Sequence, residues 1–305
     1  MDFTGERYLP EVNTPQIACE HWHRYLYAAR FVAGKSVLDI ASGEGYGSHL
    51  LASTAARVTG VDISAEAVAH ASEKYRKGNL EYRVGSAERI PIDGQGIFDL
   101  VTSFETIEHI DEVAQRRFLG EVKRLLKSNG QFIVSTPNKV SYSDQADSRN
   151  VFHVKELYSE EFMAFLSGSF RHVRFLAQRT TVVSHIADPA GHDGPYAEFG
   201  LEFGDDAARP SDKPMEPDYL VAVASDADPI QTGPSLLFDT FGLVIRTHGA
   251  IIANLANDGA KLKGSLERLA AERVVLKDRF DALTTAYKKR MDKLKALEAT
   301  LAARG

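Results

Sequence analysis

The fold is decided by one stretch of the chain, Ser36-Val37-Leu38-Asp39-Ile40-Ala41-Ser42-Gly43-Glu44-Gly45-Tyr46-Gly47-Ser48. Residues 36–40 predict a short buried strand, and the alternating glycines allow a tight turn into a helix and a close approach of a ligand to the backbone. The glycines at 43, 45 and 47 lack the GxGxxG spacing of dinucleotide sites. The carboxylate of Asp39, inside the strand, suits a cationic or amine-bearing ligand better than a pyrophosphate.

Strand-like and helix-like segments alternate around this stretch. The predicted strands cover residues 36–40, 57–61, 80–84, 98–102, 131–135, 173–183 and 219–224. Helices are predicted over 65–75 and 113–126, with Asn129-Gly130 as the cap that ends the second. This alternation is typical of a parallel sheet with helices on both faces. Residues 188–217 are rich in Gly, Pro and Asp and predict a long surface loop or lid.

Length and composition exclude several classes of protein. The 305 residues are enough for about two units at ~150 residues per domain, and 44% hydrophobic with 26% charged residues is ordinary for a globular protein. The single cysteine, Cys19, excludes an internal disulfide and favours a reducing compartment. A net charge of −6 argues against nucleic acid as the main ligand. We see no signal peptide and no apolar run long enough to span a membrane, so we expect a cytoplasmic protein.

A region of different periodicity follows the sheet segments. The expected organisation is an N-terminal helical lid segment (1–35), an α/β domain (36–225), a linker (226–250) and a long helix (251–305). In this helix, steps of four and three residues join Leu262, Leu266, Leu269, Arg273, Leu276, Phe280, Leu283, Tyr287, Arg290, Leu294, Leu297 and Leu301. A stripe this long, broken only by two arginines, predicts a coiled coil that joins copies of the chain. The alternative is a helix that folds back on its own domain.

Polar and small residues follow four of the predicted strands, where ligands bind in open α/β sheets. Asp62 ends the second strand, where a carboxylate can accept hydrogen bonds from both ribose hydroxyls of a nucleoside. Ser86-Ala87-Glu88 follows the third strand, and Phe104-Glu105 ends the fourth. With the glycine turn, these residues predict one site of nucleoside size.

These segments resemble the class I S-adenosylmethionine-dependent methyltransferases, of the type 11/12 kind. Residues 37–45, 61–64, 87–91 and 98–101 are similar to the first four motifs of that family, and residues 125–131 to the turn before its fifth strand. Ala41-Ser42 is a mild departure, because many relatives carry Cys or Gly in the second place. The resemblance covers roughly residues 1–225. It implies a Rossmann-like, seven-stranded, mostly parallel α/β sheet, here followed by the α-helical coiled coil, and S-adenosyl-L-methionine as the cofactor.

The resemblance also implies which residues hold the cofactor. The segment from Asp39 through Gly43–Gly47 would hold its methionine end, Asp62 its ribose, and Ser86–Glu88 would border its adenine. A helix over residues 21–25 could fold over the site and present Arg24 to the cofactor carboxylate. The full expected cofactor site is Arg24, Asp39, Ala41, Gly43, Gly45, Tyr46, Gly47, Asp62, Ile63, Ser86, Ala87, Glu88, Phe104 and Glu105.

The segment Glu105-Thr106-Ile107-Glu108-His109 carries candidate catalytic groups. If a helix begins there, Glu105, Glu108 and His109 share one face. His109 is then a candidate general base for a hydroxyl nucleophile, and the three side chains are a candidate site for a divalent metal such as Mg²⁺. The segment resembles the Glu-x-x-Glu-His of ubiquinone-biosynthesis O-methyltransferases, where it is linked to metal and catalysis. The alternative is that His109 only caps or packs the helix.

Other segments indicate the acceptor. The Asp/Asn-Pro-Pro-Tyr/Phe motif of nucleic-acid amino methyltransferases is replaced here by Ser103-Phe104-Glu105-Thr106. Residues 4–10, 20–25, 135–139 and 150–156 resemble methyltransferases encoded with glycosyltransferases in bacterial surface-polysaccharide pathways. The second of the two candidate catalytic residues, His153, lies in the last of these segments.

The function expected from the sequence is therefore an O-methyltransferase for a sugar hydroxyl of a surface glycan of the O-antigen type, with chain termination as one possible outcome. The substrate would be a glycan, or a nucleotide-linked or lipid-linked sugar, and the expected protein partner is a glycosyltransferase. The expected location is the cytoplasm, with a peripheral position at the inner membrane through partners as the alternative. The alternatives are an O-methyltransferase for a small phenol or quinone precursor, and a non-catalytic coiled-coil scaffold.

Overall fold

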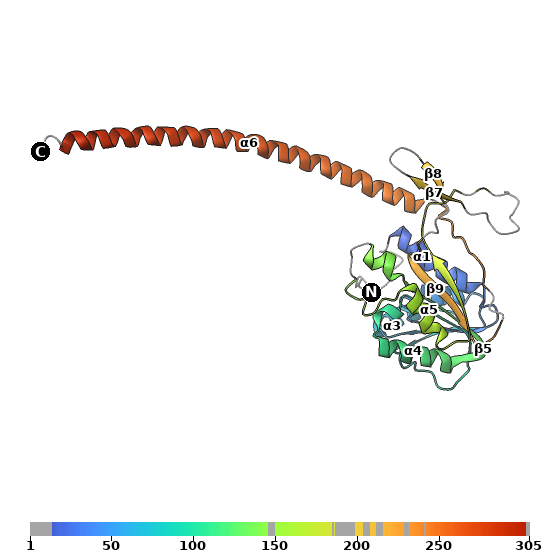
Figure 1. The fold of residues 1–305 in the computed structure, drawn as a ribbon. Helices are drawn as coiled ribbons and strands as arrows, with labels where there is room; N and C mark the ends of the chain where they lie inside the picture. Colours follow the sequence, from blue (N-terminus) through green and yellow to red (C-terminus); the bar gives the residue numbers. More distant parts are fainter. Residues whose placement is uncertain are drawn as a thin grey trace. The chain divides into compact units, whose positions relative to one another are not determined.

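The computed structural model describes residues 14–145, 150–184, 186, 199–203, 208–211, 216–228, 232–240 and 242–302. The chain divides into two compact units, Met1–Phe241 and Gly242–Gly305, which are described separately (Figure 1).

The first unit is built on a seven-stranded sheet in the order β3-β2-β1-β4-β5-β9-β6. Its strands are β1 Ser36–Ile40, β2 Arg57–Asp62, β3 Leu80–Val84, β4 Phe98–Phe104, β5 Leu126–Pro137, β6 His172–Gln178 and β9 Tyr219–Ser225. Strands β1 to β5 pair in parallel, whereas β9 runs antiparallel to both β5 and β6. The mostly parallel seven-stranded sheet expected from the sequence is confirmed.

Helices cover both faces of the sheet. They are α1 Pro15–Ala29, α2 Tyr46–Leu51, α3 Ala65–Lys74, η1 Ile107–His109, α4 Glu112–Leu125, η2 Val140–Asp144 and α5 Ser159–Ser167. Successive side chains of a strand point to opposite faces. Val37 accordingly packs in the hydrophobic cluster that contains residues of α1 and α2, and Leu38 packs in the cluster that contains residues of α4 and α5.

The structure differs from the sequence prediction at the end of α4. This helix ends at Leu125 and passes directly into β5, so Asn129-Gly130 lies within the strand instead of capping the helix. A Cβ on Gly130 would lie 2.8 Å from Cδ1 of Leu126 and 3.1 Å from the backbone oxygen of Asp99. The glycine is therefore required for this close approach of side chain and backbone.

The predicted loop over residues 188–217 also contains regular structure. Strands β7 Gly200–Phe203 and β8 Ala208–Ser211 form an antiparallel pair within it. The predicted strand 173–183 is shorter than expected, because β6 ends at Gln178.

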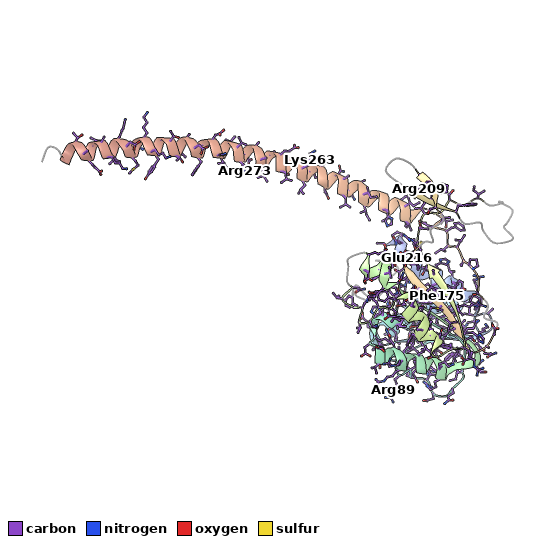
Figure 2. The ribbon with its side chains drawn as sticks, in the orientation of Figure 1. Arg89, Phe175, Arg209, Glu216, Lys263 and Arg273 are labelled. Carbon is purple, nitrogen blue, oxygen red and sulfur yellow. The ribbon has the colours of Figure 1, made fainter. Side chains whose placement is uncertain are left out.

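The second unit consists of the 60-residue helix α6, Leu243–Ala302 (Figure 1). The helix begins at Leu243 and not at residue 251 as predicted, so the last residues of the predicted linker (226–250) are helical. Its side chains project along its whole length, Lys263 and Arg273 among them (Figure 2). Among the described residues, no helix combines the length and the apolar character needed to cross a membrane.

Candidate active site at the carboxyl ends of β1, β2 and β4

The turn between β1 and α2 is held by Asp62 at the end of β2. The Gly43 N–H donates to Oδ2 of Asp62 at 2.8 Å, and the Ser64 N–H donates to Oδ1 at 2.9 Å. Ala41, Gly43 and Gly45 all have positive φ angles, of 58°, 55° and 98°. A positive φ is unusual for alanine, so this turn is strained as well as tight.

Asp39 lies beneath this turn and is fully buried. Its carboxylate accepts hydrogen bonds from Ser48 Oγ at 2.6 Å, Thr102 Oγ1 at 2.8 Å and the hydroxyl of Tyr25 at 3.2 Å. Burial raises the pKa of Asp39 to about 6, although these hydroxyl donors lower it. Asp39 therefore holds α1, α2 and β4 together around the turn.

The space beside Gly45 and Gly47 is filled by aromatic side chains. A Cβ on Gly45 would lie 2.9 Å from the hydroxyl of Tyr82, and a Cβ on Gly47 would lie 2.1 Å from Cζ of Tyr25. The neighbouring Tyr46 is also buried, and its hydroxyl lies 3.2 Å from Nδ1 of His21 on α1. These glycines thus allow the helix α1 and the strand β3 to pack closely against the turn.

Arg24 on α1 is buried at the same edge of the sheet, at 3% exposure. Its Nη1 donates to Oε1 of Gln178 at 2.8 Å and lies 3.8 Å from Oε1 of Glu105, and its guanidinium carbon lies 4.7 Å from the centre of the Tyr219 ring. Its Nε and Nη2 are buried and find no hydrogen-bond acceptor in the described part of the chain. A buried guanidinium with two such donors is suited to a carboxylate ligand.

The segments after β3 and β2 contribute both polar and apolar residues to the site. Ser86 Oγ accepts a hydrogen bond from the Glu88 N–H, Glu88 is 3.3 Å from Arg117, and Ala87 packs on the hydrophobic core. Ile63, just after β2, is 75% exposed. An exposed apolar side chain beside Asp62 provides a surface on which a flat ring can stack.

The end of β4 directs the chain sharply away from the sheet. Phe104 is buried and makes an edge-on contact with the ring of Tyr25, with ring centres 4.9 Å apart. Glu105 has φ 52° and accepts a hydrogen bond from Ser135 Oγ at 2.6 Å. Because this left-handed residue cannot belong to a helix, Glu105 does not share a helical face with Glu108 and His109. That part of the sequence prediction is wrong.

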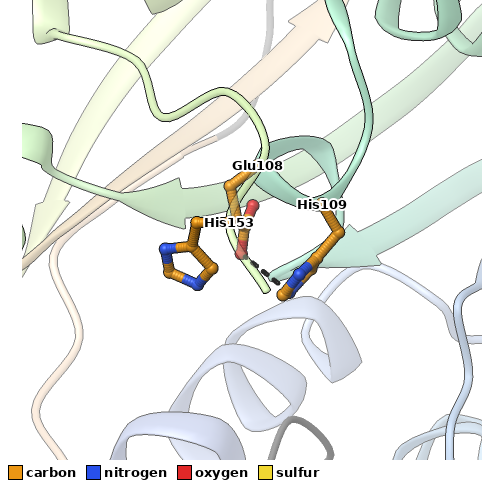
Figure 3. Close-up of side chains that lie close together, drawn as sticks. All are labelled: Glu108, His109 and His153. Atoms are coloured by element: carbon orange, nitrogen blue, oxygen red, sulfur yellow. Dashed lines mark ion pairs between the residues drawn. The ribbon is translucent and has the colours of Figure 1, made fainter. Parts of the chain in front are cut away.

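Glu108, His109 and His153 form the group of potential metal ligands in the described residues, with ligand atoms within 4.8 Å of one another (Figure 3). Glu108 is fully buried, and its Oε2 accepts from Thr136 Oγ1 at 2.9 Å. Burial, followed by the charge of Glu105, raises the pKa of Glu108 well above its usual range. Oε1 of Glu108 lies 3.7 Å from Nε2 of His109.

The site also contains residues that the sequence analysis missed. Glu20 accepts a hydrogen bond from the hydroxyl of Tyr219 at 2.8 Å, and its backbone oxygen accepts from Gln178 Nε2 at 2.9 Å. Glu44 is buried in the glycine turn and accepts from Tyr75 at 2.7 Å. No local motif marks these residues, because their partners lie far away in the sequence.

The comparisons with known proteins agree with this geometry. Residues 38–134 match the family model described as a methyltransferase domain. This stretch of the chain is therefore similar to a methyltransferase domain. The match contains the last three residues of β1 and all of β2, β3 and β4, and therefore the glycine turn, Asp62 and Glu105–His109.

The matches to curated relatives are longer than the match to the family model. A protein of Mycolicibacterium smegmatis named "Probable S-adenosylmethionine-dependent methyltransferase" is 35% identical over 172 residues, which are 54% of this chain and 63% of that protein. A ubiquinone biosynthesis O-methyltransferase of Aromatoleum aromaticum is 36% identical over 112 residues, which are 35% of this chain and 46% of that protein. The chain thus spans less than two thirds of the length of these relatives.

The solved structures support the fold. A chain of the Haloferax volcanii complex that contains the Trm112 methyltransferase activator superposes with a TM-score of 0.50 at 20% identity, over 68% of this chain and 90% of that chain. The first unit therefore has the class I methyltransferase fold. S-adenosylmethionine is the cofactor printed in the name of the M. smegmatis relative. The buried, unpaired donors of Arg24 and the carboxylate of Asp62 at a strand end fit the carboxylate and the ribose of that molecule.

Proposed function

We propose that the chain is an S-adenosylmethionine-dependent O-methyltransferase. The single observation that carries this proposal is Arg24, whose buried Nε and Nη2 have no acceptor among the described residues. Buried charged donors without an acceptor cost free energy. A ligand carboxylate at this place would accept their hydrogen bonds and remove that cost. The methionine end of the cofactor has such a carboxylate.

The remaining cofactor contacts follow from the order of the strand ends. Arg24 would bind the carboxylate, the turn at Ala41–Gly47 would lie against the methionine portion, and Asp62 would accept from the ribose hydroxyls. Ile63 and Ser86–Glu88 would border the adenine. When bound, S-adenosylmethionine supplies a methyl group already activated by its sulfonium. The protein's main task is therefore to position the acceptor.

His109 is the residue that would accept the proton of the acceptor hydroxyl. Its Nδ1 lies 3.0 Å from the backbone oxygen of Phe152, so Nδ1 carries the hydrogen and Nε2 carries the lone pair. His153 is less suited, because Nδ1 lies 2.5 Å from Oε1 of Glu156 and Nε2 lies 3.0 Å from the Asn150 amide nitrogen.

The acceptor we propose is a sugar hydroxyl of a surface glycan or its nucleotide-linked or lipid-linked precursor. Support comes from the segments that carry the polysaccharide resemblance. Residues 20–25 supply Arg24, residues 135–139 supply the hydroxyls that hold Glu105 and Glu108, and residues 150–156 supply the carbonyl that orients His109. Residues 4–10 lie outside the described residues. A cytoplasmic enzyme working with a glycosyltransferase at the inner membrane would fit this substrate.

A small phenol or quinone precursor is the second candidate acceptor. It is favoured by the ubiquinone biosynthesis O-methyltransferases among the relatives, whose names state their pathway. The exposed side chains of Val151 and Val154 near His109 could contact an aromatic ring.

We also propose that α6 pairs with a second copy of the same helix. The side chains of its stripe are mostly exposed, for example Leu276 and Phe280 at 64% and 69%. Three pairs of opposite charge flank the stripe: Asp258 and Lys263, Glu272 and Lys277, and Lys293 and Glu298. In a parallel pair of helices each of these residues would meet its opposite charge on the second copy.

Methyl transfer from radiolabelled S-adenosylmethionine tests the function. Surface-glycan oligosaccharides and small phenols would be compared as acceptors for the wild type and for His109→Ala, with the exposed His248→Ala as the matched control. We expect a glycan to be methylated, with a loss of about 100-fold or more in His109→Ala and no change in the control. If only phenols are methylated, the glycan is not the acceptor, and the result supports the small phenol or quinone precursor instead. If calorimetry detects no cofactor binding, the methyltransferase proposal is refuted, and the non-catalytic coiled-coil scaffold is the remaining interpretation.

A further inference from the structure

Glu44 lies between two glycines of the turn that follows β1, and its side chain contacts the helix α3. The residue is buried, at 2% exposure. Gly43 and Gly45 on either side of it have φ angles of 55° and 98°. We propose that Glu44 is a positioning residue of the cofactor site, whose carboxylate fixes the glycine turn to α3. This inference rests on the proposed function, because it requires that the turn lies against the methionine portion of S-adenosylmethionine.

The carboxylate of Glu44 has three partners in the second half of α3 or directly after it. Nε2 of His70 lies 3.0 Å from Oε1, and the ammonium group of Lys74 forms an ion pair with the same oxygen. The hydroxyl of Tyr75 donates to Oε2 at 2.7 Å. A buried carboxylate is unfavourable unless it is paired and hydrogen-bonded. Both oxygens of Glu44 meet this requirement through a single helix.

Tyr75 is the neutral donor among these partners. Burial, followed by the hydrogen bond to Glu44 and the charge of that carboxylate, raises the pKa of Tyr75 to about 12. Its hydroxyl therefore stays protonated at neutral pH and continues to donate. The centre of its ring lies 5.2 Å from the centre of the His49 ring on α2. The helix that follows the turn thus also borders this contact.

A second carboxylate, that of Asp62, ties the turn to the other end of α3. It accepts from a backbone N–H of the turn and from the N–H of Ser64, the residue that caps α3. Between the two carboxylates the helix packs directly on the turn, since a Cβ on Gly45 would lie 2.6 Å from Cβ of Ala71. The turn is therefore fixed to both ends of one helix, by Asp62 at the first and by Glu44 at the second.

The backbone of the turn explains why it needs this support. Ala41 has φ 58°, a conformation that persists only where the surrounding structure imposes it, and the glycines beside Glu44 can adopt many backbone conformations. Without the contact to α3, the turn of the free protein can leave the arrangement that the cofactor needs. The cofactor must then order the turn on binding, which lowers the affinity although no contact to the ligand is removed.

The cationic partners of Glu44 allow the contact to be removed without loss of the fold. The side chains of His70 and Lys74 are 32% and 33% exposed, so water can solvate both when the carboxylate is absent. We therefore expect a folded chain with a less ordered turn.

Glu121 on α4 provides a matched control. Its carboxylate accepts from Arg124 at 2.6 Å and from the N–H of Ile90 at 2.9 Å. Glu121 thus also ties a loop to a helix, but this loop is outside the glycine turn. Its replacement removes a comparable set of hydrogen bonds without affecting the contact between the turn and α3.

The test is calorimetry of the full chain with S-adenosylhomocysteine. We expect Glu44→Ala to raise the dissociation constant by about 10- to 100-fold, the range for the loss of hydrogen bonds to a charged group. Glu44→Gln keeps the shape and one acceptor oxygen, and Tyr75→Phe removes one donor, so each should raise the dissociation constant by about 3- to 10-fold. Glu121→Ala should bind as the wild type does.

Hydrogen exchange distinguishes a positioning role from a role in overall stability. In the free protein the amides of residues 41–47 should exchange faster in Glu44→Gln than in the wild type, whereas the amides of β5 should not. Bound S-adenosylhomocysteine should slow the exchange of the turn again. Circular dichroism identifies any variant that does not fold, and Tyr75→Phe keeps the test decisive if Glu44→Ala is one of these.

Two results would overturn the proposal: equal affinity of the folded Glu44→Ala and Glu121→Ala variants, and unchanged exchange of the turn amides in Glu44→Gln. Its failure is distinguishable from failure of the proposed function. Methyl transfer by the wild type, with the affinity unchanged in Glu44→Ala, refutes only the positioning role. Weaker binding in Glu44→Ala, with no methyl transfer by the wild type to any acceptor, refutes only the O-methyltransferase. A wild type that does not bind S-adenosylhomocysteine refutes both.

Discussion

Ala41 and Glu105 occupy equivalent places on two neighbouring strands. Each is the first residue after its strand, β1 or β4, and each has a left-handed backbone, with φ of 58° and 52°. Such a conformation costs about 1–3 kcal/mol per residue. At both positions the backbone turns away from the sheet at the same edge. The glycine turn begins after the first position, and the Glu108–His109 segment begins after the second.

Replacement of Arg24 is expected to weaken cofactor binding. The Arg24→Ala variant loses charge-assisted hydrogen bonds worth about 1.5–3 kcal/mol, which corresponds to roughly 10- to 100-fold in the dissociation constant. Calorimetry with S-adenosylhomocysteine measures this difference. The exposed Arg30, near the end of α1, provides the matched control Arg30→Ala, and equal affinity in the two variants would contradict the assignment.

Replacement of Gly47 is expected to destabilise the first unit. The new methyl group would lie 2.1 Å from Cζ of Tyr25, whose ring is buried and hydrogen-bonded to Asp39. Overpacking of this kind costs about 1–3 kcal/mol, measured as the free energy of unfolding in urea. The control is Gly120→Ala in α4, where no atom other than the chain neighbours and the helix's own backbone lies within 4 Å of the new Cβ. It should instead stabilise the protein by roughly 0.5–1 kcal/mol.

The pKa of Asp39, raised by burial to about 6, predicts a specific dependence of stability on pH. The folded protein keeps a proton that the unfolded chain releases above its ordinary pKa of 3.8. The resulting contribution to the free energy of unfolding is complete below pH 4 and is lost as the pH rises through about 6. Between pH 3 and 7 the wild type should therefore lose about 3 kcal/mol relative to Asp39→Asn.

Asp99 provides the control of opposite sign. Burial raises its pKa, but hydrogen bonds from Lys127 and from the Ser36 N–H outweigh burial and lower it. Its contribution to stability is present above its ordinary pKa and lost as the pH falls through the lowered value. If Asp39→Asn and Asp99→Asn change the pH profile in the same direction, the burial argument for Asp39 is wrong.

The stripe on α6 predicts that the full chain is an oligomer. Light scattering coupled to gel filtration should give a mass that is a multiple of the 33.6 kDa chain. The double variant Leu276→Asp and Leu283→Asp places charges in the stripe and should give the mass of one chain. Ala282→Asp, which lies outside the stripe, should remain an oligomer. A wild type with the mass of a single chain would refute the pairing.

The sequence was sufficient to predict the sheet and the elements at its edge. Short buried runs such as residues 36–40 and the residues after them follow local patterns, and the structure places Asp62 and the glycine turn together as expected. Local patterns also led to one mistake, because spacing alone grouped Glu105 with Glu108 and His109. In the structure Glu105 has a left-handed backbone, and its side chain contacts Ser135 and Arg24, which are distant in sequence.

The support of the site was harder to predict for the same reason. Gln178 lies at the end of β6, yet it contacts both Arg24 and the backbone of Glu20 on α1. Glu156 holds His153 only in the folded loop. Such contacts depend on the order of the strands in space, which periodicity does not reveal.

The position of β9 has a consequence for synthesis on the ribosome. Strand β6 joins the sheet only through β9, which inserts between β5 and β6 although it is the last of the seven strands in the chain. A nascent chain that ends before Tyr219 must therefore leave the edge of β5 uncovered and β6 unattached. Since chains emerge from their N-terminus, the first unit can close only after Ser225 has left the exit tunnel, while α6 is still being translated.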